Sequence, residues 1–210
     1  MANLKEGVYE SILKCAQKEF LDKGYEGASL RAIALSAATS TGSIYTRFGN
    51  KEQLFAAIVD PVYSELKRLF IDMQEVFHQF DAETQENRLD DYCERSALSL
   101  IDFLYQHPLE IELLLQASGG TPYERFMDEL IEIEVAYTYK YMEATNCGNS
   151  PCGDVMETLL HMVTTSYFNG LFEIFRHHMP KDQGLRYSKL LGIYHRAGFE
   201  KIFFSKEAGQ

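Results

Sequence analysis

The 210-residue sequence contains no run of about 18 apolar residues, the minimum for a membrane-spanning helix, so we expect no membrane association. Its first residues, MANLKEGVYE, lack the basic and apolar regions of a signal peptide, which predicts a cytoplasmic protein. The four cysteines (Cys15, Cys93, Cys147 and Cys152) are scattered, as expected for reduced thiols in that compartment and not for a disulfide framework.

Catalytic and metal-binding motifs are also missing. The sequence has neither a Gly-x-Ser-x-Gly motif nor a phosphate-binding loop. Glu75-x-x-His78 is one copy of an element that di-iron bundles need twice, and no second copy exists. Cys147 and Cys152 have no histidine or second cysteine pair nearby, which favours free thiols over a redox pair or metal site. We therefore expect no cofactor, no metal and no enzyme activity; an all-α enzyme or metal-binding bundle is the alternative hypothesis.

The composition and the charge distribution indicate whether the chain can fold and whether it can bind nucleic acid. Hydrophobic residues make up 46% of the sequence, enough to bury a core and to argue against disorder. The net charge of −11 lies entirely in residues 61–210, because residues 1–60 carry seven basic and seven acidic side chains. The N-terminal part is therefore less strongly repelled by nucleic acid than the rest, which permits DNA binding without demonstrating it.

Helical spacing recurs from end to end and no convincing period-two strand is present, which predicts an all-α protein. The first helix contains the apolar series from Val8 to Phe20 and ends near Gly24. Ser29 and Ser40 are placed to cap two further short helices, the second of which is stopped by Gly49.

A fourth helix begins at Asn50, which forms a capping-box pattern with Gln53. After Pro61 the expected helices lengthen, and we predict a head at 1–60 and a helical bundle at 61–210, about nine to ten helices in all. The longer helices are expected at approximately 62–80, 89–106, 108–118, 122–145, 154–178 and 184–204.

The two short helices between Ser29 and Gly49 have the spacing of a helix-turn-helix, whose second helix can enter the DNA major groove. Thr41, Gly42 and Ser43 would then lie nearest the bases, and Gly42 would allow close approach of the backbone. Short amphipathic helix pairs also occur in many other all-α domains, so the spacing alone leaves DNA binding open.

Three further side chains are suited to phosphate contact. The hydroxyl groups of Tyr45 and Thr46 lie one turn further along the second helix. Lys51 adds a cation at the start of the next helix, where free N–H groups and the helix dipole already favour an anion. Such contacts position a protein on DNA, whereas contacts to base edges specify the sequence.

The segment SLRAIALSAATSTGSIYTRFGNKEQLF resembles the helix-turn-helix of the tetracycline-repressor (TetR) family of bacterial regulators. The preceding ILKCAQKEFLDKGYEGASL is similar to the first helix of that family, and together they cover about fifty residues. The positions that match in order and spacing are Ile33-Ala34, Ala37, Gly42, Ile44-Tyr45, Phe48, Lys51 and Leu54. A pure protein-interaction module would leave this pattern unexplained.

One departure from the family pattern is the turn, where Ala37-Ala38-Thr39 replaces the common Ala-Gly-Val. If Ala38 needs a positive φ, the expected strain is about 1 kcal/mol, and the register of Ser40 and Thr41 against DNA becomes less certain. Arg31 and Arg47 are additional candidates for DNA contact. The full DNA-contact prediction is Ser29, Arg31, Ser40, Thr41, Gly42, Ser43, Tyr45, Thr46, Arg47 and Lys51.

The resemblance further implies a homodimer formed through the last two long helices, a palindromic double-stranded DNA operator, and a pocket for a small-molecule effector. The apolar residues of both helices cover more than one face, which independently favours a partner surface. We expect an apolar or aromatic effector, which the acidic bundle would allow to be cationic. The predicted pocket residues, each of which can equally be plain core, are Phe103, Leu114, Leu115, Phe126, Leu130, Tyr137, Tyr141, Met162 and Phe168.

Overall fold

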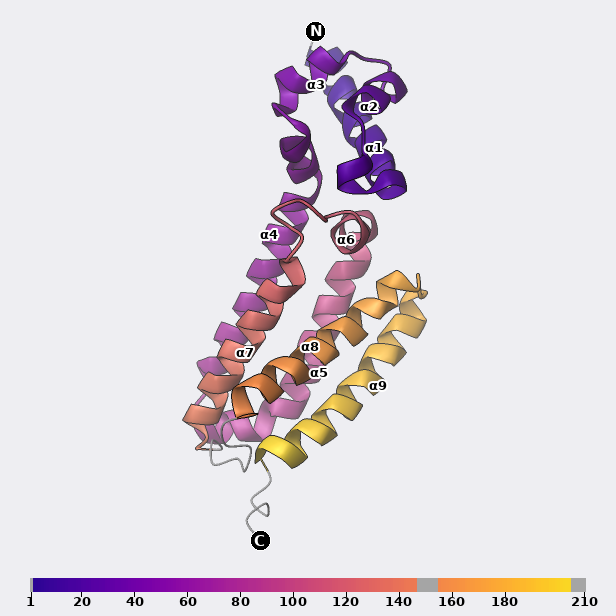
Figure 1. The fold of residues 1–210 in the computed structure, drawn as a ribbon. Coiled ribbons are helices and arrows are strands. Elements are labelled where there is room, and N and C mark those ends of the chain that lie inside the picture. Colours follow the sequence, from indigo (N-terminus) through magenta and orange to yellow (C-terminus); the bar gives the residue numbers. More distant parts are fainter. Residues whose placement is uncertain (1, 147–154, 205–210) are drawn as a thin grey trace. The chain divides into compact units, whose positions relative to one another are not determined.

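Every regular element in residues 2–146 and 155–204, the part of the chain that the computed structural model describes, is a helix (Figure 1). The all-α prediction is therefore confirmed for this part. The described ranges form nine α-helices and a short π-helical turn, η2 (Glu200–Phe204), which agrees with the expected number. None of the helices in these ranges combines the length and the apolarity that crossing a bilayer requires.

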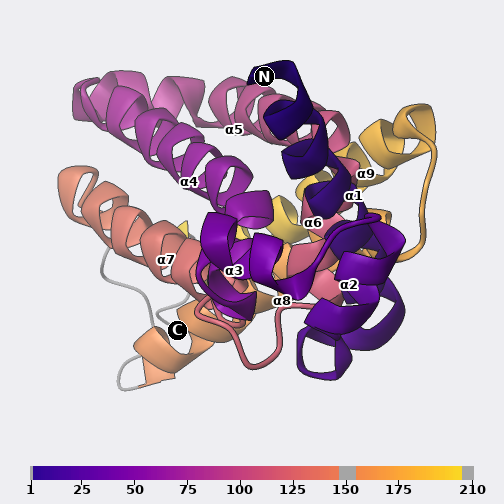
Figure 2. The ribbon, with the colours of Figure 1, turned by 90° about the horizontal axis from the view of Figure 1, so that it is seen from above.

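The chain forms two compact units, of which the first comprises Met1–Glu65 and His107–Phe126. Its core contains Phe20, Ile33, Ile44 and Phe55, all fully buried. Helices α2 and α3 contact each other across a short turn, and α1 contacts both α2 and α6 (Figure 2). The helices of this unit are α1 (Ala2–Gly27), α2 (Leu30–Ser36), α3 (Thr41–Phe48), the first half of α4 (Lys51–His78) and α6 (Pro108–Gln116).

Glycine residues and a local cap lie at the helix ends of the first unit where the sequence predicts them. Gly24 interrupts the helical conformation of α1 with a φ of 70°, and Gly49 ends α3 with a φ of 80°. The backbone N–H of Gln53 donates to Asn50 Oδ1 over 2.7 Å, which caps the first turn of α4.

The predicted helix boundary at Pro61 is wrong, because α4 continues through this residue from Lys51 to His78. Proline removes one backbone hydrogen bond and usually kinks or ends a helix. Here the residues on both sides, Ile58, Val62 and Leu66, are buried, whereas Pro61 itself is exposed. Packing of the flanking turns therefore outweighs the local cost of the proline.

The second compact unit comprises Leu66–Gln106 and Met127–Gln210. Helix α9 contacts both α5 and α8, and α8 and α9 run alongside each other in Figure 1. Gly170 allows this approach, because a methyl group there would lie 3.2 Å from Leu191 of α9. The helices of this unit are the second half of α4, α5 (Ala82–Gln106), α7 (Phe126–Ala144), α8 (Met156–Arg176) and α9 (Lys181–Phe199).

Three helix starts differ from the expected positions, each for a local reason. Helix α5 begins at Ala82, because Asp81 Oδ1 accepts a 2.9 Å hydrogen bond from the N–H of Thr84 and caps the first turn. Helix α7 begins only at Phe126, because Thr121 holds the preceding residues in turns through its 2.6 Å bond to the Ser118 carbonyl. Helix α9 begins at Lys181, directly after Pro180.

Candidate nucleic-acid interface and interior cavity

The helix-turn-helix of the first unit is held by two serine caps and a shared apolar core. Ser29 Oγ accepts from the N–H of Ala32 over 3.5 Å, and Ser40 Oγ accepts from the N–H of Ser43 over 3.1 Å. Ile44 and Phe48, one turn apart on α3, are buried. Because these two residues lie on one face of α3, the residues on the opposite face point outward and form the exposed side of the helix.

The turn between α2 and α3 has the strained residue that the sequence suggested. Ala38 adopts a φ of 51°, in the left-handed region, and its side chain is exposed. The turn is closed by backbone hydrogen bonds from Ala38 to Leu35 (3.1 Å) and from Thr39 to Ala34 (2.9 Å). The Ala-Ala-Thr sequence thus forms an ordered turn, with an expected strain of about 1 kcal/mol.

The outward side of α3 carries small and polar residues. Gly42, Tyr45 and Thr46 are exposed, and the side chain of Tyr45 retains 55% of its accessible surface. The Thr46 hydroxyl donates to the Gly42 carbonyl over 2.8 Å, so in this state the hydroxyl proton is directed to the helix itself. The remaining predicted contacts on α3, which are half-buried, are Thr41, Ser43 and Arg47.

No packing constraint among the described residues requires a glycine at position 42. A methyl group built there would meet only Ser40 Oγ, at an ordinary contact distance of 3.7 Å. Its backbone also lies in the first turn of an α-helix, where alanine is favoured over glycine by up to about 1 kcal/mol. Close approach of another molecule to this backbone would explain the residue; nothing within the described protein does.

The side chain of Lys51 forms hydrogen bonds within the first unit. Its Nζ donates to the backbone carbonyls of Tyr25 (2.7 Å), Glu26 (3.1 Å) and Ala28 (3.3 Å) and lies 4.5 Å from the centre of the Tyr25 ring. This ammonium group therefore caps carbonyls at the C-terminal end of α1, where backbone carbonyls lack intrahelical partners, together with the Ala28 carbonyl just beyond it. Sequence reasoning missed this role, because it depends on residues 23 to 26 positions away.

The two other predicted contacts lie at the start of α2. Arg31 is exposed, and Ser29, besides capping α2, donates its backbone N–H to Glu19 Oε1 over 3.1 Å. The structure thus places most of the predicted DNA-contact residues on α3 and its cap, and the others at the first turns of α2 and α4.

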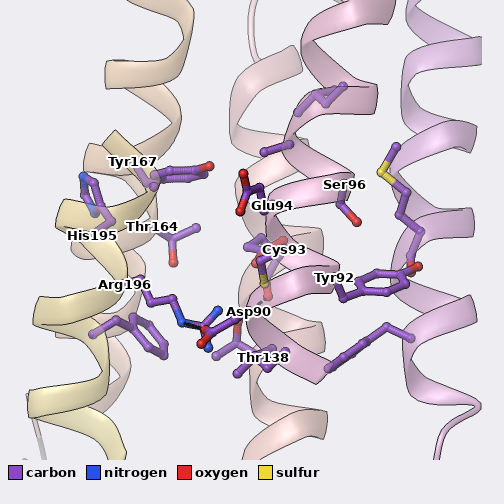
Figure 3. A pocket seen from close by; sticks show the side chains of 18 of the residues that line it. Asp90, Tyr92, Cys93, Glu94, Ser96, Thr138, Thr164, Tyr167, His195 and Arg196 are labelled. Carbon is purple, nitrogen blue, oxygen red and sulfur yellow. Dashed lines mark hydrogen bonds and ion pairs between the residues drawn. The ribbon is translucent and has the colours of Figure 1, made fainter. Parts of the chain in front are cut away.

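The second unit contains a cavity of about 560 Å³. Its lining side chains come from α4, α5, α7, α8 and α9 (Figure 3). Its size lies within the range of small-molecule sites in proteins.

Three of the nine predicted pocket residues, Tyr137, Tyr141 and Phe168, line this cavity. Met162 is 64% exposed on α8, and Leu115 is half-buried on α6. The other four are buried but are not among the lining residues: Phe103, Leu114, Phe126 and Leu130. Leu114, Leu115 and Phe126 belong to the first unit, whereas the cavity belongs to the second.

Glu134 of α7 places a carboxyl group in the cavity wall. Gln74 of α4 donates its amide N–H to Glu134 Oε2 over 2.5 Å. The surrounding protein atoms raise the pKa of Glu134 to about 7, because the charged carboxylate is poorly hydrated there, and the Gln74 hydrogen bond offsets only part of this effect. The burial of Glu134 is incomplete, since the cavity still reaches it.

The basic side chains of the cavity are paired with other carboxylates. The Arg196 guanidinium forms ion pairs with Asp90 (Figure 3) and, over 2.8 Å, with Glu200. Lys189 Nζ lies 2.7 Å from Glu94 Oε1. The pairs with Asp90 and Glu94 connect α9 to α5, so they hold these two helices together on one side of the cavity.

The surrounding protein atoms reduce the hydration of several other polar groups in the wall. This effect raises the pKa of the Cys93 thiol to about 11, although Cys93 is exposed on one side, and raises that of the half-buried Tyr167 hydroxyl above its ordinary value. It also lowers the pKa of His195, whose ring stacks edge-on against Tyr167 with centres 5.1 Å apart (Figure 3). A thiol with so high a pKa is a poor nucleophile at neutral pH.

Glu134 was missed in the sequence, although a signal for it exists. Leu130, Glu134, Tyr137 and Tyr141 follow the three-and-four spacing of one helix face, so the acid interrupts an otherwise apolar stripe. Glu132, two residues away, lies on a different face and is exposed. A carboxyl group on an apolar stripe is expected to face a polar partner or a cavity.

Among the described residues, no group of three or more His, Cys, Asp or Glu side chains is placed to hold a metal ion. Cys147 and Cys152 lie outside these residues, and nothing further is inferred for them.

Comparison with known proteins identifies the helix-turn-helix region. The family described as bacterial regulatory proteins, tetR family, matches residues 12–58. The Bacillus subtilis HTH-type transcriptional regulator YhgD, itself uncharacterized, is 31% identical over 111 residues, which cover 52% of this chain and 53% of that protein. The repressor AcnR of Corynebacterium efficiens is 41% identical over 49 residues, 23% of this chain and 26% of its own. The matches thus span about half or less of these relatives' length.

Solved structures extend the similarity to nearly the whole chain at the level of the fold. NalD of Pseudomonas aeruginosa, the secondary repressor of the MexAB-OprM multidrug efflux pump, aligns over 92% of this chain and 95% of its own. The TM-score is 0.56 and the sequence identity is 19%.

Proposed function

Because the chain belongs to the tetR family of bacterial regulatory proteins, whose model matches residues 12–58, we propose that it is a ligand-responsive transcriptional repressor. In this proposal it binds a palindromic double-stranded DNA operator as a homodimer and is released by a small apolar or aromatic effector. This family consists of regulators and not enzymes, so an all-α enzyme or metal-binding bundle has no support. DNA binding also implies a cytoplasmic location.

The exposed face of α3 is the observation that carries the proposal. Gly42, at the N-terminal end of this helix, is exposed and has room for a methyl group, and exposed Tyr45 lies one turn further on. A helix of this kind enters the major groove with its N-terminal residues toward the base edges. We assign Thr41, Gly42 and Ser43 to the bases, and Tyr45 and Arg47 to phosphates.

Residues 1–60 would form the DNA-binding domain, and residues 61–210 the effector-binding and dimerisation domain. The surface of α8 and α9 supports the proposed dimer interface. Leu190, Ile193 and Tyr194 of α9 are 68%, 58% and 75% exposed, and Met162 of α8 is 64% exposed. Such a concentration of exposed apolar side chains is characteristic of surfaces that bind a partner.

The chain connections provide a route from the cavity to the DNA-binding helices. The chain passes between the two units after Glu65, after Gln106 and after Phe126. At each crossing, the part of the chain in the second unit belongs to a helix that lines the cavity. These helices are α4, α5 and α7. A molecule that binds one arrangement of these three helices more tightly than another would therefore shift the equilibrium between the two arrangements and, with it, the position of the first unit. A molecule without such a preference cannot shift this equilibrium.

Within the first unit, α6 is tied to α1 and the following loop to α4. The N–H of Tyr25 donates to the Ala117 carbonyl over 3.1 Å, and the Tyr123 hydroxyl donates to Asp60 Oδ1 over 3.0 Å. Movement of α5 or α7 would therefore be passed to the helices that carry the DNA contacts and not be absorbed in a loose connection.

The proposal is tested by titrating the protein onto duplex DNA from upstream of its own gene and onto unrelated DNA of equal length. Fluorescence anisotropy at low and at moderate salt measures both affinities. We expect selective binding that weakens with salt, and uniformly weaker binding by Tyr45→Ala with an unchanged dimer mass. Equal affinity of the wild type for both duplexes, together with no effect of Tyr45→Ala, would contradict the proposal.

A further inference from the structure

The cavity of the second unit has an excess of negative charge in its wall. Of the described residues, four with carboxyl groups line it (Asp90, Glu94, Glu134 and Glu200), against the two cationic side chains of Lys189 and Arg196. An occupant with a positive charge would therefore be favoured over an anion of the same size.

Glu134 is the carboxyl group of this set that lacks a cationic partner among the described residues. Lys189 is bound to Glu94, and Arg196 to Asp90 and Glu200. The two nitrogens of His78 face the backbone carbonyls of Gln74 and Tyr137 at 2.8 and 3.1 Å. Within the part of the chain that the structure describes, the polar partner of the Glu134 carboxylate is therefore the neutral amide of Gln74. A carboxylate in such surroundings gains most from a cation supplied from outside.

The position of Glu134 is central with respect to the surrounding helices. Gln74 of α4 contacts it directly, and Cys93 of α5 and Tyr167 of α8 line the same cavity. A group bound at this carboxylate would thus lie in a cavity that is lined by all three helices that continue into the first unit.

Aromatic rings provide an apolar environment around this charge. Phe70 and Phe168 pack edge to face with ring centres 5.7 Å apart, and Phe77 packs against Tyr92 and Tyr141 at 5.0 and 6.1 Å. All five residues line the cavity. Aromatic faces attract organic cations and bury apolar groups, so they complement the carboxylate.

We propose that this cavity binds a lipophilic organic cation, with the positive nitrogen or phosphonium centre at Glu134 and the apolar or aromatic body against the surrounding rings. The inference rests on the proposed function in taking the cavity as the effector site, and it adds the charge of the effector and the residue that recognises it.

The protonation of Glu134 gives this binding a characteristic pH dependence. With a pKa of about 7, Glu134 is mostly protonated at pH 6 and mostly ionised at pH 8. The affinity for a permanent cation should therefore rise roughly tenfold between these pH values. His78, Cys93, Tyr167, His195 and Arg196 also face the cavity, so the effect of Glu134 is isolated by comparing wild type with Glu134→Gln at each pH.

Tetraphenylphosphonium and tetraphenylborate are suitable probes, because they match in size and shape and differ in the sign of a permanent charge. Binding to DNA-free protein is measured by calorimetry at pH 6 and pH 8 for wild type, Glu134→Gln and Glu143→Gln. Glu143 lies on the same helix, is exposed and does not line the cavity, so it controls for the loss of one charge. Thermal melts establish that each variant is folded.

At pH 8 we expect wild type and Glu143→Gln to bind tetraphenylphosphonium at least about tenfold more tightly than Glu134→Gln does, with only weak binding of tetraphenylborate. The increase from pH 6 to pH 8 should be absent in Glu134→Gln. Equal affinity of wild type and a folded Glu134→Gln variant, a preference for the borate, or no binding of the phosphonium would overturn the inference. Because DNA is absent, these outcomes are independent of whether the protein binds an operator.

Discussion

At the scale of single residues, Gly42 is better explained by contact with a partner than by packing within the protein. A methyl group there would meet only Ser40 Oγ among the described residues, at an ordinary contact distance. The same reasoning distinguishes Lys51, which bonds three carbonyls of its own chain, from Tyr45, whose ring is exposed. Tyr45 is therefore the cleaner probe of DNA contact, since replacing Lys51 would also remove bonds that stabilise the first unit.

Gly42→Ala should leave the protein folded and raise its stability by up to about 1 kcal/mol, because alanine is the better helix former. The same methyl group should lower DNA affinity at least about tenfold if the backbone of α3 lies against base edges. Thermal melts and DNA titration of the one variant measure the two effects. Unchanged DNA affinity would show that this part of α3 does not approach DNA closely.

Glu134 should make the stability of the protein depend on pH in a definite direction. Its pKa is raised to about 7 in the folded protein, so the folded state holds a proton that the unfolded state releases at lower pH. The free energy of unfolding therefore falls as pH rises from about 4.5 to about 7. Relative to wild type, Glu134→Gln should gain about 1–3 kcal/mol at pH 8 and little at pH 5.

Chemical denaturation of both proteins at the two pH values, without ligand, tests this expectation. Taking the difference between the proteins removes the contributions of other titrating groups such as His195. A gain for Glu134→Gln that is equal at pH 5 and pH 8 would mean that Glu134 does not titrate in this range.

At the scale of elements, the turn between α2 and α3 stores strain that one substitution should release. Ala38 has a φ of 51° and an exposed side chain, so glycine can replace it without loss of packing. Ala38→Gly should raise the free energy of unfolding by roughly 0.5–1 kcal/mol, since relief of the left-handed conformation outweighs the greater entropy of unfolded glycine.

The midpoint of thermal unfolding measures this change, and Ala32→Gly inside α2 is the matched control, for which the midpoint should fall. If both variants were destabilised equally, the turn would have no special conformational requirement.

The elements also divide into those that the sequence predicts and those that it does not. Ser29, Ser40, Gly49 and Asn50 define helix ends through contacts within three or four residues, so their roles could be predicted. The continuation of α4 through Pro61 could not, because it depends on burial of the flanking turns against other helices.

The pocket residues illustrate the same limit at longer range. An aromatic residue at helical spacing has the same local pattern whether it packs in the core, as Phe103 does, or lines the cavity, as Tyr141 does. Only the arrangement of the helices decides between them. Glu134 was within reach of sequence reasoning, since an acid on an apolar stripe is visible in the local pattern.

At the scale of the whole molecule, reading a palindromic site requires two copies of the chain, because one α3 contacts only half of such a site. Leu190 and Tyr194, both exposed on α9, are expected at the centre of the interface between copies. The double substitution Leu190→Asp and Tyr194→Asp should convert the dimer to folded monomers and weaken operator binding strongly, because charges would be buried against an apolar partner.

Sedimentation equilibrium measures this change. The control is Leu35→Asp on α2, where leucine is 83% exposed but lies in the first unit, so the mass should stay that of a dimer. A double variant that remains dimeric would place the interface elsewhere on the molecule.

Whether paired α3 helices read a palindromic DNA sequence can be decided by selecting duplexes from a random library with the full-length protein and sequencing those retained. We expect an enriched palindrome whose half-sites are centred about one helical turn, or a small multiple of it, apart. Substitutions at Ser43 should change the enriched bases, whereas Tyr45→Ala should reduce retention without changing them. A retained pool with no common sequence, wherever the natural operator lies, would contradict the claim.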